Sequence, residues 1–304
     1  MIKLFFNFLI FPGFLFTAIA GLAASWIDRK VTARIQWRVG PPWYQPLIDL
    51  VKLSIKEITV PRTASKELFF ISPMIGLSAV TLVSTLVWLA NIGPASKGFS
   101  GDIIVAVYLL TLPAIAVILG ASASGNPLAS LGASREIKMV MAYELPFIIS
   151  IIVPIIKSHG LLRLGDIINY QAANGPFIAS LSGAIAFIVM IFCMQAKLGL
   201  VPFDASEAET EIMAGTFIEY SGMLLAIFKL TKAMLIVVLP LFLITLFWQG
   251  FGFLSLWKYL ILLVVIILIR NTNPRVRIDQ AVRFFWGKMT LLSIIAVLLA
   301  IKGM

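Results

Sequence analysis

Charged residues are scarce in this 304-residue chain: Asp, Glu, Lys and Arg make up only 12% of it, whereas hydrophobic residues make up 60%. A soluble globular protein usually carries about 25% charged residues. The composition therefore excludes a water-soluble domain and indicates an integral membrane protein. The net charge of +10 comes from 24 basic and 14 acidic residues. In a membrane protein such an excess reflects basic loops on one side rather than affinity for nucleic acid.

Metal-binding side chains are also nearly absent, since the chain has one cysteine, Cys193, and one histidine, His159. One residue of each kind cannot build a disulfide framework, a cysteine-ligated iron–sulfur cluster, a zinc site or bis-histidine haem ligation. The sequence also lacks a Walker-type phosphate loop and a dinucleotide-binding glycine pattern. We therefore expect no cofactor or metal in this chain, and any redox centre of its assembly is expected in a partner subunit.

Long hydrophobic runs, by contrast, are abundant. A transmembrane helix needs about 20 mostly apolar residues, and the bilayer core does not admit open strands. The sequence predicts a single all-α integral membrane domain over residues 1–304. Eight windows are apolar enough for transmembrane helices, at residues 4–26, 69–90, 102–121, 139–156, 178–196, 222–247, 252–269 and 287–301.

The loops between these windows differ in charge. Most Lys and Arg residues outside the windows fall in loops one, three and seven. Because basic loops stay on the cytoplasmic side, we predict a multi-pass protein of the cell membrane whose odd-numbered loops are cytoplasmic and whose termini both lie outside.

The first loop contains a stretch patterned as a surface helix. Over residues 46–58, apolar side chains fall on one side, whereas Asp49, Lys52 and Lys56 follow helical spacing on the other. This pattern predicts an amphipathic helix in the membrane interface between the first two spans. An ordinary amphipathic connector would show the same pattern.

Just before this stretch, Lys30, Arg34 and Arg38 recur every four residues, so a helix there would carry one positive stripe. The stripe would either orient the chain on an anionic membrane face or dock an acidic partner.

The fifth loop differs from the other odd-numbered loops. Residues 199–221 carry Asp204, Glu207, Glu209, Glu211 and Glu219 but no Lys or Arg. Ser206 followed by Glu209 matches a capping box, which would assign part of this acidity to a helix start. On such a helix Glu207 and Glu211 would share one face, and like charges that close are expected to share a proton.

Several ionisable residues fall within predicted spans, and three of them are candidates for function: Glu144 in the fourth span, and Lys229 and Lys232 in the sixth. Ionisable groups inside a membrane are costly enough to mark functional sites, and carboxylate–lysine chains are typical of proton routes. For Glu144 the alternative is a structural hydrogen bond between helices.

Three stretches resemble the NuoH-type membrane subunit shared by respiratory complex I and the membrane-bound energy-converting nickel–iron hydrogenases. They are DRKVTARIQWRVGP at residues 28–41 with QPLIDLVKL at 45–53, VPFDASEAETE at 201–211 with EYSG at 219–222, and PRVRIDQ at 274–280. These stretches are separated by the predicted spans, so the resemblance covers essentially the whole chain.

The resemblance implies an eight-helix subunit at the junction between a soluble redox arm and an ion-translocating membrane arm. Combined with the residue patterns above, it gives a candidate proton route of Glu144, Asp204, Glu207, Glu209, Glu211, Glu219, Lys229 and Lys232. The candidates for the cavity at the arm junction are Arg29, Lys30, Arg34, Arg38, Asp49, Arg135, Arg275, Arg277 and Asp279.

One departure from the complex I pattern bears on the electron acceptor. Only Pro42, Trp43 and Tyr44 lie between Pro41 and Gln45, where complex I subunits usually have a longer, glycine-containing segment at the quinone entrance. This shortening, together with the stretch LGASRE at residues 131–136, resembles the hydrogenase-type branch.

We therefore expect a membrane-anchoring and coupling subunit of a ferredoxin-linked, energy-converting hydrogenase-like complex that translocates protons or sodium ions. The expected partners are hydrophilic iron–sulfur and nickel–iron hydrogenase-like subunits on the cytoplasmic face, other membrane subunits including antiporter-like ones, and the lipid bilayer, but no nucleic acid. The alternatives are the same role in a quinone-reducing or a sulfur-reducing complex and, more distantly, a stand-alone ion-coupled transporter.

Overall fold

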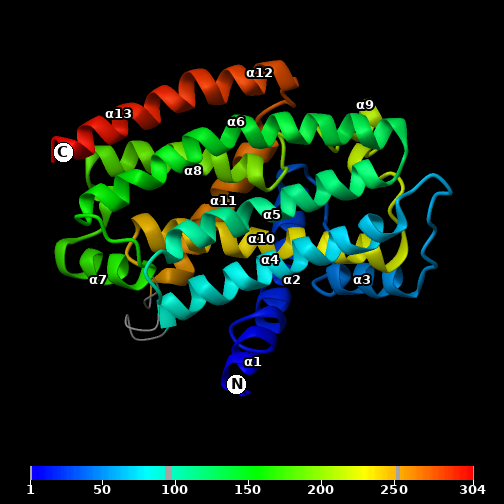
Figure 1. Ribbon diagram of the computed structural model, residues 1–304, viewed down its shortest axis with the longest axis horizontal. Helices are drawn as coiled ribbons and strands as arrows, with labels where there is room; N and C mark the ends of the chain where they lie inside the picture. The colour runs from blue at the N-terminus through cyan, green and yellow to red at the C-terminus, as the bar shows by residue number, and fades with distance from the viewer. Residues whose placement is uncertain (1, 93–97, 251–253, 304) are drawn as a thin grey trace.

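The computed structural model describes residues 2–92, 98–250 and 254–303, with backbone only for residues 2–4, 209 and 210. Every regular element within these ranges is helical (Figure 1). The α-helices are α1 Ile2–Leu9, α2 Phe14–Ile35, α3 Gln45–Ile55, α4 Lys66–Ile92, α5 Asp102–Ala123, α6 Pro127–Lys157, α7 Leu164–Asn174, α8 Leu181–Lys197, α9 Glu209–Ile212, α10 Gly222–Phe247, α11 Ser255–Thr272, α12 Ile278–Arg283 and α13 Thr290–Ile301. Two short 3₁₀ helices, η2 Phe177–Ala179 and η3 Gly215–Phe217, and one π-helical turn, η4 Phe284–Met289, complete the regular elements within these ranges.

Seven helical segments among the described residues are long and apolar enough to cross a membrane. They are Phe5–Ile35, Lys66–Ile92, Asp102–Ala123, Pro127–Lys157, Gly222–Phe247, Ser255–Thr272 and Ile278–Ile301. The fifth predicted span corresponds to α8, which is apolar but only 17 residues long. At about 1.5 Å per residue, α8 is shorter than the hydrocarbon core of about 30 Å. The multi-pass membrane architecture is confirmed, whereas the predicted number of eight spans is not.

The predicted first span is interrupted near its start. Helix α1 ends at Leu9 and α2 begins at Phe14, with Pro12 between them. Proline has no backbone N–H and its ring obstructs the preceding turn, so a single helix does not pass through this point. Beyond the break, α2 continues to Ile35 and carries Lys30 and Arg34, whereas Arg38 lies past its end. The predicted three-residue basic stripe is therefore wrong in its last member.

Helix α6 begins well before the predicted fourth span. The side chain of Asn126 accepts a hydrogen bond from the backbone N–H of Leu128, and Pro127 occupies the first helical position. Both are typical helix-start features, and they extend the helix to 31 residues. As a result, Arg135 and Glu136 stand on the same helix as Glu144.

Helix α10 forms the centre of the bundle. All of its residues from Ala233 to Phe247 are buried, and it packs against α2, α3 and α4. In Figure 1, α2 crosses α10 steeply, while α4, α5, α6 and α13 run roughly lengthwise. Lys229 and Lys232 lie near the start of α10, at the end of the bundle where α3 and α9 also lie (Figure 1).

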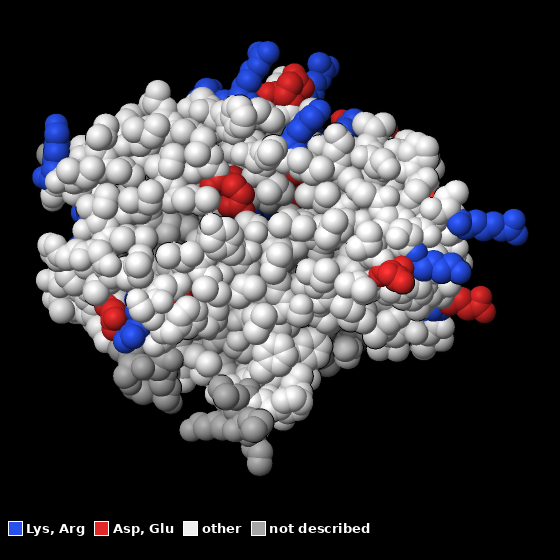
Figure 2. Space-filling model, viewed as in Figure 1, with Lys and Arg blue, Asp and Glu red and all other residues white. Residues whose placement is uncertain are grey.

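Helix α3 occupies most of the predicted surface-helix stretch, although it ends at Ile55 rather than at residue 58. Leu47, Val51 and Ile55 point outward, with exposures of 53%, 50% and 80%. Figure 2 shows that the charged side chains of the visible face gather mostly near its rims, leaving a broad uncharged middle. Placement of α3 in the membrane interface stays a prediction.

The crossing of α2 and α10 is closest at Gly21. A Cβ atom on Gly21 would lie 2.6 Å from the backbone oxygen of Ala233, so the two helices approach without any side chain between them. Such contacts are made possible by small residues at membrane helix interfaces.

We predict that Gly21→Ala destabilises the protein by about 1–3 kcal/mol, the usual cost of overpacking, because the added methyl meets backbone that cannot move aside freely. The matched control is Gly287→Ala, since a Cβ there meets nothing within 4 Å. Thermal unfolding of the purified complex should show a lower midpoint for the first variant alone. Equal midpoints for the two variants would contradict a tight crossing.

Candidate functional site

The most deeply buried charged group in the site is Lys197, at the end of α8. Its side chain is 2% exposed, and its ammonium donates a hydrogen bond to Oε1 of Glu144 at 2.5 Å. The same ammonium lies over the rings of Tyr143 and Phe147, 5.1 and 4.5 Å from their centroids. Glu144 Oε2 is buried and has no hydrogen-bond partner among the described residues. The pair therefore leaves one carboxylate oxygen available for a proton or a water molecule.

A second ion pair joins Glu207, in the loop after α8, to Lys232 on α10. Both side chains are partly buried, with exposures of 24% and 32%. The Lys232 ammonium also lies 4.9 Å from the ring centroid of Phe217. The acidic loop is thus attached to the central helix at this point.

A small cavity connects the two ion pairs. Its lining includes Lys197, Glu207, Lys232 and Glu136, and its volume is about 30 Å³. A site must offer roughly 10–15 Å³ and several polar partners to hold a water molecule. This cavity meets both requirements, so one water could lie between Lys197 and the Glu207–Lys232 pair, although Glu144 itself does not line the cavity.

A larger, open cavity of about 260 Å³ adjoins the second pair on the other side. Glu207 and Lys232 line this cavity as well, together with Asp204, Arg270 and Arg275. Asp204 pairs with Arg275 at 2.9 Å. Arg270 pairs with Asp28 of α2 at 2.6 Å. The Glu207–Lys232 pair therefore lines both the larger polar cavity and the small cavity beside Lys197.

The acidic loop is not the helix that its sequence predicts. Helix α9 spans only Glu209–Ile212 and is preceded by Ala208 as its N-cap residue, so the predicted capping box at Ser206 is wrong. The Ser206 hydroxyl instead donates to Glu136 Oε2 at 2.5 Å. Two residues with positive φ, Met213 and Ala214, follow α9. Left-handed backbone of this kind is incompatible with helix continuation.

Because the helix is so short, Glu207 and Glu211 do not share a helical face. Glu207 pairs with Lys232, whereas Glu211 pairs with Arg135 at 2.5 Å and is 52% exposed. The predicted sharing of one proton between these two carboxylates therefore has no structural basis. The side chain of Glu209 lies outside the described part of the structure.

Two further members of the predicted route lie apart from the two cavities. Glu219 accepts a hydrogen bond from the amide of Asn126 at 2.5 Å. Lys229 is exposed on α10 and influences Asp49 of α3 by its charge. Neither residue lines the cavities around Glu207.

The predicted junction residues are centred on Asp49. Its carboxylate accepts hydrogen bonds from Arg29 at 2.7 Å and from Gln45 at 2.8 Å. Burial alone would raise the pKa of Asp49, but these hydrogen bonds and the charges of Arg29 and Lys229 lower it below its ordinary value. The carboxylate is therefore ionised at neutral pH and holds α3 against α2.

The other junction candidates divide into paired and exposed groups. Arg135 and Arg275 form the ion pairs described above. The aliphatic chain of Lys30 packs against the backbone at Gly40, since a Cβ atom added to Gly40 would lie only 3.0 Å from Lys30 Cδ. The exposed members are Arg34, Arg38, Arg277 and Asp279.

Sequence reasoning missed several residues of this site, namely Lys197, Glu136, Asp28 and Arg270. Lys197 follows directly after an apolar window and lies two residues before the acidic loop. The sequence pattern therefore assigns it neither to the predicted span nor to the acidic loop. A lysine at the end of a predicted span is a detectable signal, but its partner lies 53 residues away in sequence. Among the described residues, no group of three His, Cys, Asp or Glu side chains could hold a metal ion.

Comparison with known proteins gives consistent similarities along nearly the whole chain. The family model described as NADH dehydrogenase matches residues 7–301. The H subunit of NADH-quinone oxidoreductase from Thermomicrobium roseum is 34% identical over an alignment of 312 positions, gaps included, which covers 92% of this chain and 91% of that protein. The corresponding H subunit from Dehalococcoides mccartyi strain CBDB1 is 31% identical over 294 residues, covering 92% and 81%.

One solved structure is similar over its full length. It belongs to the membrane-bound sulfane sulfur reductase, described as an archaeal respiratory membrane complex. The TM-score is 0.88 with 28% sequence identity, and the match covers 98% of this chain and 99% of that one.

The buried ion pair generates a prediction about stability. Glu144→Gln leaves the Lys197 ammonium without a counter-charge, and breaking a buried ion pair in this way costs about 3–5 kcal/mol. Combining it with Lys197→Met removes the stranded charge, and the thioether keeps favourable contact with the two aromatic rings. We expect the single variant to lower the yield and unfolding midpoint of the complex and the double variant to restore them.

The exposed Glu57→Gln serves as the matched control and should change neither quantity. If the double variant were as unstable as Glu144→Gln, the stability of this region would not depend on charge balance.

Proposed function

Since the chain belongs to the NADH dehydrogenase family, whose members include the H subunits of NADH-quinone oxidoreductase, we propose that it couples redox chemistry in partner subunits to ion movement across the membrane. The family resemblance seen in the sequence is confirmed by the whole-length matches. The chain is thus a multi-pass membrane subunit of the kind found in complex I-like oxidoreductases. Its relatives work in multi-subunit complexes, so other subunits are implied for this chain also.

The observation that carries the proposal is the line of two ion pairs joined by a water-sized cavity. Glu207–Lys232 faces both the open polar cavity and the small one, and Lys197–Glu144 lies beyond it. A carboxylate, an amine and a bridging water all exchange protons readily. The chain of groups therefore supports proton passage better than passage of a sodium ion, which needs several oxygen ligands around it at once.

The electrostatics of the buried pair suggest how a proton would be passed on. When a proton reaches Glu144, the carboxylate becomes neutral and the Lys197 ammonium loses its counter-charge. An unpaired ammonium in a low-dielectric site is costly, so Lys197 then releases its proton through the cavity toward Glu207. Each protonation thus drives a deprotonation nearby, and movement of charge requires no redox group in this chain.

A surface for the soluble partner is proposed at the loop between α2 and α3. This loop exposes Trp37, Val39 and Trp43 by 98%, 75% and 73%. Neighbouring exposed apolar side chains of this size commonly mark protein–protein contacts. The nearby basic residues Lys30, Arg34 and Arg38 add positive charge, which would attract acidic subunits that carry iron–sulfur and nickel–iron centres.

For the electron acceptor we propose protons or a sulfur species, supplied with electrons by ferredoxin, rather than quinone. The connection between Pro41 and Gln45 is short, and the sulfur reductase subunit is matched over 99% of its length. The H subunits of NADH-quinone oxidoreductase from Dehalococcoides mccartyi and Thermomicrobium roseum are matched over 81% and 91% of their lengths, so each has residues beyond the matched part. The quinone-reducing role of those relatives is the second candidate function.

We predict that Glu207→Gln lowers the number of ions translocated per electron, because the amide cannot take up the proton released from Lys197. Reconstituted vesicles containing the whole complex allow electron transfer and gradient formation to be measured together. Removing a positioned proton-transfer group typically costs a factor of about 10²–10⁴ in rate, so coupled turnover should fall strongly while the complex stays assembled.

The control is again Glu57→Gln, which should behave as the unmodified complex does. An unchanged ion-to-electron ratio in Glu207→Gln, with the assembled complex verified, would assign the proton route to other residues.

The acceptor is tested by supplying reduced ferredoxin to the purified complex with protons, polysulfide or quinone in turn. We expect hydrogen or sulfide as the product and little effect of quinone-site inhibitors. Rapid quinone reduction that these inhibitors block competitively would instead favour the complex I-like role.

A further inference from the structure

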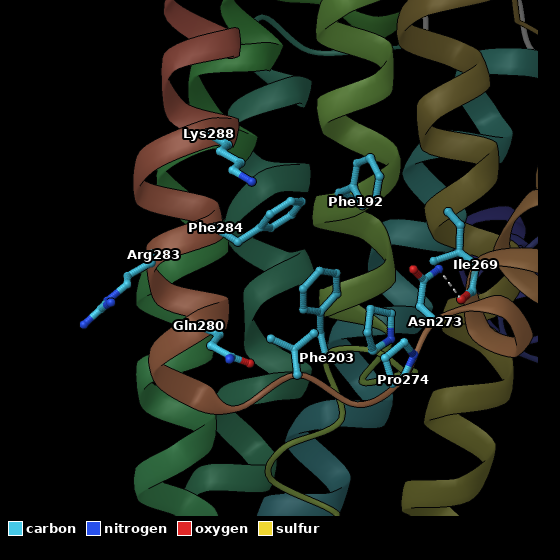
Figure 3. A pocket seen from close by; sticks show the side chains of 11 residues that line it. Phe192, Phe203, Ile269, Asn273, Pro274, Gln280, Arg283, Phe284 and Lys288 are labelled. Carbon is cyan, nitrogen blue, oxygen red and sulfur yellow. Dashed lines mark hydrogen bonds between the residues drawn. The ribbon is translucent and has the colours of Figure 1, made fainter.

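A groove of about 430 Å³ opens on the side of the bundle where the last helix begins. It lies between α8, the loop that follows α8, the end of α11, and the segment from α12 into η4 (Figure 3). Its walls are largely apolar and aromatic, with Phe192, Phe203 and Phe284 contributing rings that face the groove (Figure 3). This groove is separate from the cavities around Glu207.

The position of the groove relative to the membrane follows from the last helix. Lys288 is the final charged residue before an uninterrupted uncharged run over residues 289–301, and Lys302 follows that run. Trp286, which is 56% exposed, donates its indole N–H to the backbone oxygen of Met141. Tryptophan is enriched where the hydrocarbon meets the headgroups. The groove therefore opens at the level of the lipid headgroups.

The groove combines this apolar interior with unbalanced positive charge. In Figure 3 the Lys288 side chain reaches toward the groove beside Phe284, whereas Arg283 points away from it. Lys288 forms no ion pair or hydrogen bond with any residue that the structure describes. No Asp or Glu lines the groove. Its occupant should therefore supply a negative charge.

The surrounding segment has the same charge bias. Residues 270–288 contain a single acid, Asp279, and five bases. Arg270 and Arg275 are paired with Asp28 and Asp204, which leaves Arg277, Arg283 and Lys288 against Asp279. Figure 2 shows basic side chains standing around an acidic one over α12, at the top of the view. Basic pockets between transmembrane helices at this level are suited to anionic lipid headgroups.

We propose that the groove binds one anionic phospholipid, with its phosphate at Lys288 and an acyl chain along the rings of Phe192, Phe203 and Phe284. A phospholipid satisfies both features at once, because its phosphate neutralises the lysine and its chain fills an apolar space. The π-helical turn Phe284–Met289 contributes both the ring of Phe284 and the ammonium of Lys288 to the groove. Such turns recur at functional sites in helices.

The test uses the intact complex in nanodiscs that contain phosphatidylglycerol and phosphatidylcholine in equal amounts. Benzoylphenylalanine is placed at Ile269, which lines the groove, or at Leu291, which is exposed on α13 outside it. After irradiation, mass spectrometry identifies what is attached to the chain. One basic residue near a membrane surface favours an anionic lipid about fivefold. We therefore expect phosphatidylglycerol to be captured about fivefold more often than phosphatidylcholine at Ile269. At Leu291 we expect the two lipids to be captured equally.

Variants then test the role of the charge. Lys288→Gln should abolish the enrichment at Ile269, whereas the matched Lys302→Gln, at the other end of the same helix, should leave it unchanged. If Lys288→Gln fails to assemble, the crosslink at Ile269 in the unmodified chain still tests whether an anionic lipid occupies the groove.

Three results would overturn the assignment. Equal capture of the two lipids at Ile269 would show that the groove holds only bulk lipid. Capture of a peptide from a neighbouring subunit would make it a protein interface. Loss of the enrichment on adding inorganic phosphate would make it a site for small anions, since free phosphate has no chain to occupy the apolar walls.

Discussion

The structure depends on one electrostatic constraint: a charge removed from water must find its counter-charge within the protein. Lys197 meets that requirement through Glu144, and this pair joins α8 to α6. Arg270 meets it through Asp28, which joins α11 to α2. Each pair connects elements far apart in the sequence, so the pairing of buried charges also holds the helices in register.

This constraint would let the proposed proton route work through charge alone, since among the described residues no group of three His, Cys, Asp or Glu side chains could hold a metal ion. A carboxylate and an amine in contact can exchange a proton, and neutralising either one changes the free energy of the other. Under the proposed function, redox chemistry in a partner subunit would act on the buried pair by changing the charge or the water content near Glu207. The family to which the chain belongs includes complexes with different electron acceptors, and such a charge-based route is compatible with any of them.

Much of the fold could be predicted from the sequence because membrane spans are encoded locally. The window at residues 222–247 coincides with α10, since the two lysines near its start, Lys229 and Lys232, are followed by an uncharged and largely apolar run to Phe247. The start of α6 was missed because its first turns carry polar residues, although Asn126 and Pro127 are recognisable helix-start signals. The short α9 was missed because an acidic, helix-compatible sequence gives no indication that Met213 and Ala214 adopt left-handed backbone.

The site was predictable in part. The acidic loop and Glu144 stood out because carboxylates are unusual in such surroundings, but their partners did not. Which lysine faces which glutamate depends on how helices pack, and no local pattern records that Lys197 faces Glu144 across 53 residues. Glu136 falls in a polar loop of the predicted topology, whereas the extended α6 brings it beside Ser206 and the small cavity.

The unequal exposure of these ion pairs separates them by their response to dissolved salt. Mobile ions screen exposed charges over about 8 Å at physiological ionic strength, but they screen buried pairs much less. Arg135–Glu211, whose carboxylate is 52% exposed, therefore weakens as salt is added, whereas Lys197–Glu144, with its lysine 2% exposed, keeps its strength. The strength of the exposed ion pair therefore depends on salt concentration, whereas the strength of the buried ion pair does not. A change of ionic strength acts on the contacts at its surface while the charge balance within the bundle is preserved.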